Sequence, residues 1–368
     1  MNIEQLIKER IPDGVQYLQL WDIAKLRKWT QLNKDMLSSE WEYPVINWGI
    51  NPSWYWNDFN VDKNTISISQ WWASAWYVNY LKTPFWAGAH CYYIDNKSFS
   101  WNYKFLYYVV KWYERNLMAS QEWAWIPSVS SKKVEELEIP LPSIEIQNEI
   151  VNILDKFTEL EDMLGKELEE RRRQYEYYRD ELLNFTEKNI KRVTIKDICT
   201  VERWQVYSKI YLSEHSWDYP VYSSQTANNW ELWKIDTYNY EWEYLTRTTD
   251  WAYAWTIFRR SWKFSITNVC GLLSLKDNSE INLSFLFYRL SVEAKKYVSE
   301  WMWNPKLMSN VMEKIPVPVP SLVEQEKIVS ILDKFDKLIN NITGCLPAEI
   351  EMRQKQYEYY RDKLLTFN

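Results

Sequence analysis

The chain has 368 residues, of which 46% are hydrophobic, and a formal net charge of −6 at pH 7. The length allows two or three domains, and the negative charge argues against a protein that coats nucleic acid without specificity. No apolar run reaches the roughly 18 residues of a membrane-spanning helix, and the charged first residues, M-N-I-E-Q-L-I-K-E-R, do not resemble a signal peptide. We therefore expect a cytoplasmic protein that does not bind membranes.

Residues 1–142 are predicted to form a first globular domain. The string T-I-S-I-S at 65–69 alternates apolar and polar residues, as a half-buried strand does, whereas residues 105–113 have the pattern of a helix. A domain that mixes such segments belongs to the α+β class. The prolines of I-P-L-P-S at 139–143 mark its end.

Residues 143–190 are predicted to form one long helix, from residue 144 to residue 185. Its apolar residues mostly recur every three or four positions, at Ile150, Ile153, Phe157, Leu160, Leu164, Leu168, Tyr175, Tyr178, Leu182 and Phe185. Such a helix would extend about 63 Å and cannot bury its apolar stripe alone. The segment also carries most of the net negative charge, so any nucleic-acid surface must be a local patch elsewhere.

Residues 191–320 are predicted to form a second α+β domain, with a β-rich segment at 255–258 and a helix at 283–298. Residues 321–368 then form a second helix with a matching stripe: Ile328, Ile331, Phe335, Leu338, Ile342, Ile350, Tyr357, Tyr360, Leu364 and Phe367. The string G-C-L-P at 344–347 places a helix-ending glycine and a helix-starting proline inside it. We expect a break or kink there.

An internal repeat organises the whole chain. The string I-L-D-K-F occurs at 153–157 and 331–335, and Q-Y-E-Y-Y-R-D occurs at 174–180 and 356–362. Weaker matches join W-E-Y-P-V at 41–45 to W-D-Y-P-V at 217–221. Two helices with equal stripes can cover each other, so we expect an antiparallel coiled coil with pseudo-twofold symmetry.

The repeated Q-Y-E-Y-Y-R-D places tyrosines and an arginine around each helix, so some of them must face away from the partner helix. Exposed Tyr and Arg often anchor protein–protein contacts. The candidate partner-binding residues are Tyr175, Tyr177, Tyr178, Arg179, Tyr357, Tyr359, Tyr360 and Arg361.

The order of globular domain, proline-punctuated entry, I-L-D-K-F and Q-Y-E-Y-Y-R-D, followed by a second copy of all four, resembles the specificity (S) subunit of type I restriction-modification systems. The opening P-D-G-V-x-Y-x-x-L at 12–20 is similar to the start of a target-recognition domain in this family. The resemblance covers nearly the whole chain. It implies two tandem α/β target-recognition domains, residues 1–142 and 191–320, with a central spacer helix at 143–190 and a C-terminal spacer helix at 321–368.

The resemblance also implies the function and the partners. Each target-recognition domain reads one half of a split, asymmetric sequence in double-stranded DNA, and the helices act as a ruler and a scaffold. Two methyltransferase subunits bind the scaffold and methylate adenine with S-adenosylmethionine, and two restriction (translocase-nuclease) subunits can join them. The specificity subunit itself is not an enzyme and holds no cofactor.

The sequence independently favours a non-catalytic chain. It contains neither the [DN]-P-P-[YF] motif of adenine methyltransferases nor a G-x-x-x-x-G-K-[ST] phosphate loop. The four cysteines form no C-x-x-C pair, and His90 and His215 are too few to indicate a metal site. We expect no metal and no catalytic residue.

DNA contacts are expected from Lys and Arg on phosphates and from polar side chains on base edges. Candidates in the loop-like stretches of the first domain are Lys28, Thr30, Gln31, Asn33, Lys34, Asn51 and Lys82. Candidates in the second domain are Tyr207, Ser208, Lys209, Ser223, Gln225, Arg247, Thr248, Arg259 and Arg260.

Tryptophan stands where the family has glycine. The chain has 24 Trp and only 6 Gly, and Trp occupies turn contexts such as T-D-W-A-Y-A-W-T at 249–256. Glycine readily adopts the positive φ angles of turns, whereas tryptophan is strained there. We hypothesise that UGA codons read as glycine in the source organism were translated as tryptophan. With glycine at 251, 255 and 262, residues 248–264 are predicted to form strand, turn and strand.

Two other functions remain open. The abundance of Trp and Tyr also fits a carbohydrate-binding module, in which aromatic rings stack on sugars, although such a module does not need the helix pair. The helix pair alone fits a structural coiled-coil adaptor without DNA specificity.

Overall fold

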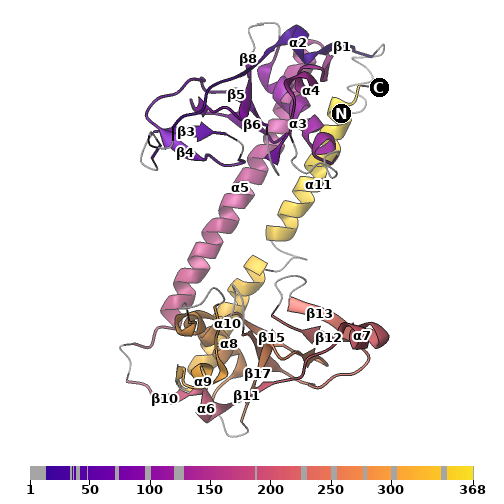
Figure 1. Ribbon diagram of the computed structural model, residues 1–368. Coiled ribbons are helices and arrows are strands. Elements are labelled where there is room, and N and C mark those ends of the chain that lie inside the picture. Colours follow the sequence, from indigo (N-terminus) through magenta and orange to yellow (C-terminus); the bar gives the residue numbers. More distant parts are fainter. Residues whose placement is uncertain are drawn as a thin grey trace. The chain divides into compact units, whose positions relative to one another are not determined.

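The structure is a computed structural model (Figure 1). It describes residues 14–33, 35, 37–38, 42–47, 49–70, 74–95, 101–119, 128–186, 189–224, 230–249, 255–276, 280–299, 305–340 and 346–367. The chain divides into two compact units. Unit 1 combines residues 1–165 with 349–368, and unit 2 comprises residues 166–348.

The globular part of unit 1 contains short strands, two small helices and one longer helix. In chain order these are β1 (Gln16–Gln19), α2 (Leu20–Ile23), β2 (Lys25–Lys28), β3 (Tyr43–Ile46), β4 (Trp54–Trp56), β5 (Thr65–Ser69), β6 (Val78–Leu81), β7 (Trp86–Ala87), β8 (Cys91–Asp95), α3 (Tyr103–Ala119), α4 (Ser131–Glu135) and β9 (Glu138–Leu141). The strand expected at 65–69 is confirmed, and the helix expected at 105–113 lies within α3.

The globular part of unit 2 repeats this order and adds a short helix, α7, and a 3₁₀ turn, η4. Its elements are β10 (Arg192–Thr194), α6 (Ile195–Ile198), β11 (Cys199–Arg203), α7 (Lys209–Glu214), β12 (Ser216–Tyr222), β13 (Glu231–Ile235), β14 (Tyr244–Thr248), β15 (Ile257–Arg260), β16 (Ser265–Ile266), β17 (Cys270–Leu275), α8 (Leu283–Glu293), η4 (Ala294–Tyr297), α9 (Ser309–Met312) and β18 (Pro316–Pro318). The helix expected at 283–298 is therefore an α-helix that ends at Glu293 and tightens into a 3₁₀ turn.

The two units share one sheet topology. Among the described residues, unit 1 has sheets in the orders β1-β9, β2-β8-β5-β6 and β4-β3-β7, and unit 2 has β10-β18, β11-β17-β14-β15 and β13-β12-β16. In each three-stranded sheet one pair is parallel, joining Val45 to Trp86 in unit 1 and Val221 to Ser265 in unit 2. Of the strand, turn and strand expected at 248–264, the second strand is confirmed as β15, whereas its antiparallel partner β14 ends at Thr248, the first residue of that range. Residues 250–254 lie outside the described residues.

Long helices complete both units. Helix α5 (Ile144–Leu182) has 39 residues, slightly fewer than the segment 144–185 expected to be helical. The last part of the chain forms two helices, α10 (Leu322–Asn340) and α11 (Leu346–Leu365), so the expected break lies between them. Gly344 and Cys345 lie outside the described residues.

Each unit draws helix segments from both copies of the sequence repeat. In unit 1 the first turns of α5 share a core with Leu364, Leu365 and Phe367 at the end of the chain. In unit 2 the first turns of α10 share a core with Leu183 and Phe185, just after the end of α5. The compact units therefore do not coincide with the two sequence repeats.

Several tryptophans have a backbone conformation that suits glycine. Trp76, Trp230, Trp242 and Trp262 have φ angles of 75°, 62°, 97° and 70°. The left-handed region costs an L-residue with a side chain about 1–2 kcal/mol relative to the usual regions. This geometry supports the hypothesis that glycine belongs at these positions.

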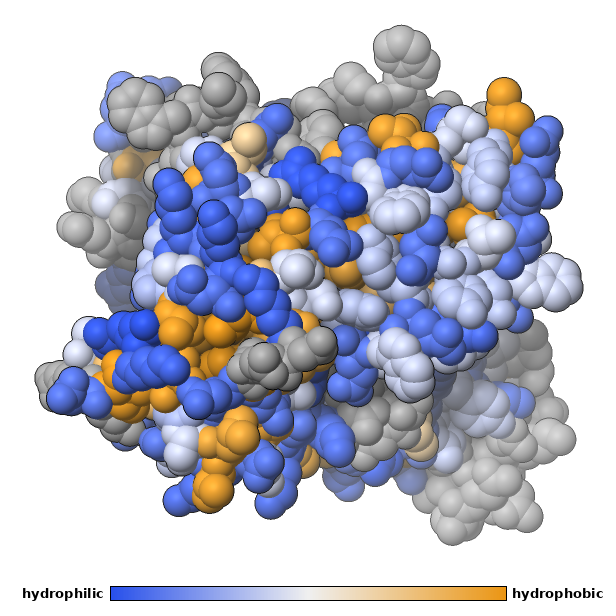
Figure 2. All heavy atoms as spheres, turned by 90° about the horizontal axis from the view of Figure 1, so that it is seen from below, coloured by the Kyte–Doolittle hydropathy of each residue, from blue (hydrophilic) through white to orange (hydrophobic). Residues whose placement is uncertain are grey.

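The surface is largely polar where it is visible in Figure 2. On that face, apolar side chains gather in separate patches with hydrophilic and aromatic residues between them. Among the described residues, no helix is both long enough and apolar enough to span a lipid bilayer.

Candidate nucleic-acid interface and helix contacts

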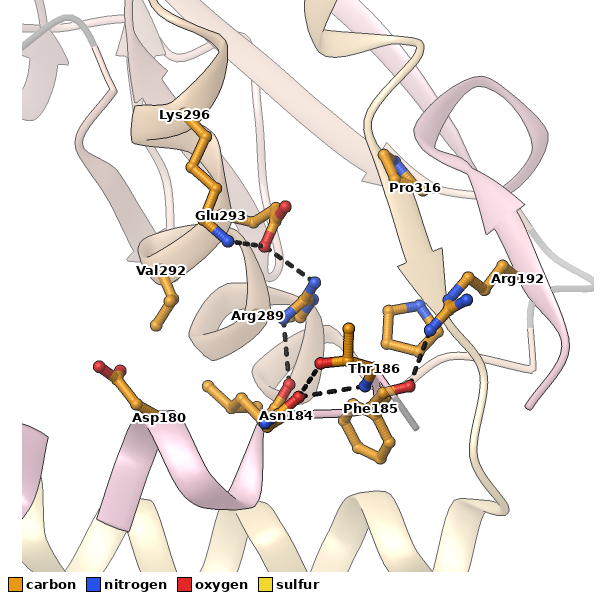
Figure 3. A pocket seen from close by; sticks show the side chains of 12 residues that line it. Asp180, Asn184, Phe185, Thr186, Arg192, Arg289, Val292, Glu293, Lys296 and Pro316 are labelled. Atoms are coloured by element: carbon orange, nitrogen blue, oxygen red, sulfur yellow. Dashed lines mark hydrogen bonds and ion pairs between the residues drawn. The ribbon is translucent and has the colours of Figure 1, made fainter. Parts of the chain in front are cut away.

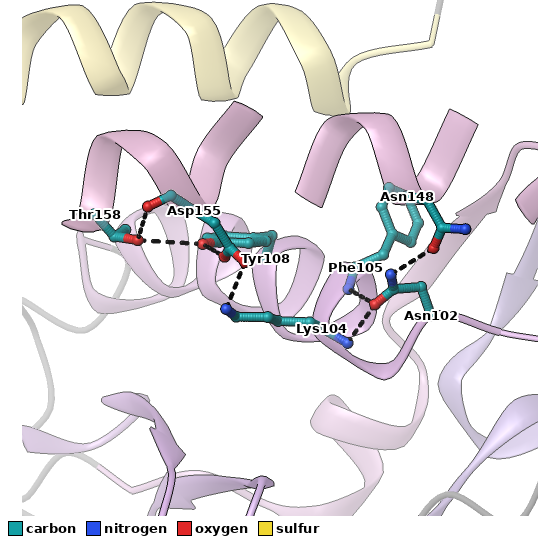
Figure 4. A network of polar contacts seen from close by, with 7 residues as sticks. All are labelled: Asn102, Lys104, Phe105, Tyr108, Asn148, Asp155 and Thr158. Atoms are coloured by element: carbon teal, nitrogen blue, oxygen red, sulfur yellow. Dashed lines mark hydrogen bonds and ion pairs between the residues drawn. The ribbon is translucent and has the colours of Figure 1, made fainter. Parts of the chain in front are cut away.

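A group of hydrogen bonds fastens the globular part of unit 1 to α5 (Figure 4). The hydroxyl of Tyr108, on α3, donates to Asp155 of α5 at 2.5 Å, and the ammonium group of Lys104 lies 2.6 Å from the same carboxylate. At the start of α3, the backbone N–H of Asn102 donates to the side chain of Gln147 at 3.0 Å. The Asn102 side chain in turn accepts from two N–H groups of the first turn of α3, and so caps that helix.

Unit 2 contains the same bonds at the matching positions. Tyr288 of α8 donates to Asp333 of α10 at 2.6 Å, and the backbone N–H of Asn282 donates to Gln325 at 2.7 Å. The Asn282 side chain caps α8. We call the Tyr–Asp and Asn–Gln bonds of each unit the clasp. A clasp fixes the angle between a globular part and its helix, because its two bonds lie about two helical turns apart.

The sequence contained a signal for the clasp that pattern reading missed. Residues 102–108 and 282–288 share the string N-x-x-F-L-[YF]-Y, in which the first and last residues make the clasp bonds. The aspartate is the third residue of each I-L-D-K-F copy.

The aromatic residues of the two repeated motifs pack together within each unit. In unit 1 the ring of Phe157 stacks on Tyr360 at 5.4 Å and lies 6.3 Å from Tyr357. In unit 2 the ring of Phe335 stacks on Tyr178 at 5.8 Å and lies 6.3 Å from Tyr175. The I-L-D-K-F of one copy therefore meets the Q-Y-E-Y-Y-R-D of the other copy.

These contacts divide the candidate partner-binding residues into two groups. Arg179 and Arg361 lie over Tyr175 and Tyr357 of their own helices, with each guanidinium also paired to the following aspartate. The outward side chains are Tyr177, which is 65% exposed, and Tyr359, which is 56% exposed. The two exposed tyrosines occupy the same position in the two motif copies.

The candidate DNA-binding residues of unit 1 lie on its surface. Exposed side chains are those of Lys28, Thr30, Gln31, Asn33, Asn51 and Lys82. Gln31 accepts a 2.9 Å hydrogen bond from the buried Asn47, which ties this exposed side chain to the end of β3. Lys34 lies outside the described residues.

In unit 2 only part of the candidate set lies on the surface. Ser208 and Lys209 are exposed at the start of α7, where Ser208 caps the helix, and Tyr207 is half-buried with its hydroxyl on Asn239. Arg259 is partly exposed, but it forms an ion pair with Asp333 at 3.0 Å and so joins the clasp. Gln225 lies outside the described residues.

Four other candidates of unit 2 are buried. Arg247 is fully buried, Thr248 and Ser223 are nearly so, and Arg260 lies within 3.6 Å of the centre of the Tyr222 ring. Burial lowers the pKa of Arg260 from its usual value. These placements do not fit the surface role expected from the sequence. Strand β14 and the end of β15 lie inside the domain, and Ser223 follows β12 at a buried position.

A cavity of about 610 Å³ lies beside the end of α5 in unit 2 (Figure 3). Arg289 reaches across it to donate to the carbonyl of Leu183 at 3.0 Å, and Arg192 donates to the carbonyl of Phe185 at 2.7 Å. Glu293 balances the charge of Arg289 at 2.9 Å. The two arginines thus satisfy carbonyl groups beyond the last turn of α5, where no helical N–H is available.

The described residues contain no group of three or more His, Cys, Asp or Glu side chains placed to hold a metal ion. In this part of the chain, Cys91, Cys199 and Cys270 are buried free thiols, and burial raises the pKa of each to about 12. They have the character of core residues.

Comparisons with known proteins agree with this architecture. The family model of the type I restriction modification DNA specificity domain matches twice, at residues 12–170 and 187–352. A putative type I specificity subunit from Mycoplasma pneumoniae is 40% identical over 252 residues, covering 66% of this chain and 91% of that relative. The EcoR124I/EcoR124II specificity subunit of Escherichia coli is 33% identical over 270 residues, covering 66% and 65%.

The fold also has solved counterparts. The crystal structure of a type I restriction-modification S subunit from M. genitalium superposes with a TM-score of 0.64 and 20% identity, covering 96% of this chain and 97% of that one. Each family match covers a globular part and the first part of the helical segment that follows it. The chain belongs to the family of type I restriction-modification specificity subunits.

Proposed function

We propose that the chain selects the DNA target of a type I restriction-modification complex, and that each unit reads one half of a split, asymmetric sequence. The supporting observation is the repetition of the clasp. Two domains with one strand order are each fastened to a helix by the same two hydrogen bonds. A subunit that reads two half-sites needs two readers held in a defined orientation, and the clasp supplies this for each reader.

In this proposal the globular parts, residues 1–142 and 191–320, are the target-recognition domains, and residues 143–190 and 321–368 are spacer helices. We infer that the helices run antiparallel as a coiled coil with pseudo-twofold symmetry. Support comes from unit 1, where Phe157 meets Tyr357 and Tyr360. Ile146 and Ile150, earlier in α5, share a core with the later residues Leu364, Leu365 and Phe367.

The DNA surface in this proposal comprises the exposed candidates of both domains. Lys28, Lys82 and Lys209 would neutralise phosphates, and Thr30, Gln31, Asn33, Asn51 and Ser208 offer hydrogen bonds to bases or phosphates. Lys34 and Gln225 remain predictions.

The exposed Tyr177 and Tyr359 are proposed as anchors for two methyltransferase subunits, one on each helix copy. Their equal placement in two copies of one motif fits two identical partners. The methyltransferase subunits would supply S-adenosylmethionine and the chemistry, and two restriction subunits can complete the complex in the cytoplasm.

The test is to express the chain with its methyltransferase subunit and map adenine methylation across a genome. We expect methylation at a single motif made of two short blocks separated by unread bases. Footprinting should show protection of both blocks. Methylation without a split motif, with an active methyltransferase, would contradict the proposal and favour a structural adaptor.

The carbohydrate-binding alternative rests on exposed aromatic rings. Trp54, Trp217 and Trp233 are exposed on strands, whereas Trp242 and Trp262 are exposed at left-handed backbone positions and Trp76 is buried. This alternative does not account for the repeated clasp, which a sugar-binding surface does not need. Binding of the chain to polysaccharide columns would revive this alternative.

A further inference from the structure

In each unit, a buried side chain donates a hydrogen bond to a backbone carbonyl at the same position of the fold. The side chain that donates differs between the two units. In unit 1 the N–H of Val129 donates to the carbonyl of Gln70, and in unit 2 the N–H of Leu307 donates to the carbonyl of Thr249. Gln70 and Thr249 each follow the strand that pairs with β8 or β17. Val129 and Leu307 therefore correspond, and the carbonyl group of each accepts a hydrogen bond from a buried side chain.

In unit 2 that side chain is Arg247. Its Nη1 donates to the carbonyl of Leu307 at 2.6 Å, and its Nη2 donates to the hydroxyl of Ser309 at 2.9 Å. Arg247 is fully buried. Its cross-strand neighbour is Gly271, and a Cβ atom there would lie 2.8 Å from Nε of Arg247. The glycine therefore provides the space that the guanidinium occupies.

In unit 1 the corresponding carbonyl, that of Val129, accepts its hydrogen bond from a residue on the neighbouring strand, β8. The cross-strand pair that corresponds to Arg247 and Gly271 is Ile68 and Tyr92. The Tyr92 hydroxyl donates to the carbonyl of Val129 at 3.4 Å and accepts from Gln70 at 2.9 Å. Unit 1 thus has an apolar residue where unit 2 has the arginine, and a large polar residue where unit 2 has the glycine. We call the bond to Val129 or Leu307 the carbonyl tie.

The carbonyl tie lies beside other buried polar groups at the same edge of each domain. In unit 2 the N–H of Thr249 donates to Ser224, which follows β12. In unit 1 the N–H of Gln70 donates to the carbonyl of His90, whose own N–H donates to Asn47, the residue bound to the exposed Gln31. Buried polar groups that are hydrogen-bonded to one another hold the backbone in one arrangement. Base reading requires such precision, because bidentate contacts tolerate displacements of only about 0.5 Å.

From this arrangement we propose that Arg247 and Tyr92 are positioning residues for sequence reading, each acting on the half-site that its own unit reads. Neither side chain contacts DNA. Each holds its domain edge in the geometry that discriminates bases. This inference rests on the proposed function.

The test uses the reconstituted complex with its methyltransferase subunits and its mapped target. Binding is measured to the cognate duplex and to duplexes with a changed base in one half-site or the other. We expect Arg247→Met to lower discrimination about tenfold at one half-site only. Tyr92→Phe, which removes one hydroxyl, should lower discrimination about fivefold at the other half-site.

Matched variants separate positioning from lost stability. Val317→Ala removes buried volume from the core of unit 2 at β18 without removing a hydrogen bond of the carbonyl tie, and should lower the melting temperature while leaving discrimination unchanged. Arg247→Lys keeps one donor and should restore part of the discrimination. If Arg247→Met does not fold, Gly271→Ala tests the same tie by displacing the guanidinium.

Three results would overturn the inference: unchanged discrimination in Arg247→Met and Tyr92→Phe, equal losses at both half-sites from either variant, or a loss in Val317→Ala as large as in Arg247→Met. A wild-type complex that methylates no split motif would instead overturn the proposed function. The two failures are therefore distinguishable.

Discussion

The hydroxyl of Tyr108 donates a 2.5 Å hydrogen bond to the carboxylate of Asp155, and this bond joins a globular domain to the long helix that follows it. Burial, together with the neighbouring carboxylate, raises the pKa of Tyr108 well above its usual value, so the hydroxyl keeps its proton. In the other unit, burial and the equivalent hydrogen bond to Asp333 raise the pKa of Tyr288.

Tyr108→Phe should lower the free energy of unfolding by about 1.5–3 kcal/mol, since a hydrogen bond to a charged group is lost and Asp155 keeps its burial. Urea denaturation followed by circular dichroism measures the loss. Tyr177→Phe, at an exposed position, is the control and should change the unfolding free energy by less than about 0.5 kcal/mol. Equal values for the two variants would show that the clasp does not stabilise the domain.

Stability should fall steeply in alkaline solution. Burial raises the pKa of Tyr357 from 10.0 to about 12, and the pKa of buried Cys270 from 9.0 to about 12. Because these pKa values are raised in the folded state, the two groups contribute fully to the free energy of unfolding below pH 9. This contribution is lost as the pH rises through the range 9–12. Denaturation midpoints at pH 8, 10 and 11 test this, and Tyr357→Phe should flatten the decline above pH 10. A midpoint that stays constant from pH 8 to 11 would contradict it.

Replacing exposed left-handed tryptophans with glycine should stabilise the chain. Trp242 and Trp262 combine positive φ with high exposure, so each glycine should add about 1 kcal/mol by relieving strain while little burial is lost. Trp54, exposed in strand β4, is the control, and glycine there should destabilise the chain by about 0.5–1 kcal/mol.

The coding sequence gives a second check on the tryptophans. UGA codons at Trp217, Trp230, Trp251 and Trp255 are expected. UGG at these positions would end the recoding hypothesis, whatever the stability measurements show.

Tyr177→Ala and Tyr359→Ala should each weaken binding of a methyltransferase subunit about tenfold, since exposed tyrosines commonly anchor such interfaces. The unfolding midpoint should not change, because both side chains are more than half exposed. Met163→Ala, at another exposed position of α5, serves as control. Titration by calorimetry measures the affinities, and wild-type affinity in both tyrosine variants would place the docking surface elsewhere.

Lys28→Ala and Lys209→Ala should reduce DNA affinity for every sequence alike. Loss of one phosphate contact should also reduce the slope of log affinity against log salt by about 1. Lys355→Ala on α11, where the lysine pairs with Glu351, should leave the slope unchanged. A change in sequence preference without a change in slope would assign these lysines to bases.

The sequence predicts the positions of regular helices and strands well, and it predicts the solvent exposure of individual side chains poorly. The strand at 65–69 and the helices at 144 and 283 begin where the pattern placed them, because periodicity is a local property. Arg247 looked like a surface residue, since a buried arginine is rare and its acceptors, Leu307 and Ser309, are about 60 residues away. No pattern in the sequence around Arg247 indicates hydrogen-bond partners that far along the chain.

The sequence by itself determined the repeat, the α+β class of both domains and the apolar stripe of each long helix, because these depend on spacing along the chain. Tertiary structure alone decided which residues of the two stripes meet. Phe157 packs on Tyr360 and Phe335 on Tyr178, so each unit combines one copy of I-L-D-K-F with the Q-Y-E-Y-Y-R-D of the other copy. The stripe fixes the apolar face of each helix, but it does not fix the register of one helix against the other, because that register depends on contacts between residues far apart in the sequence.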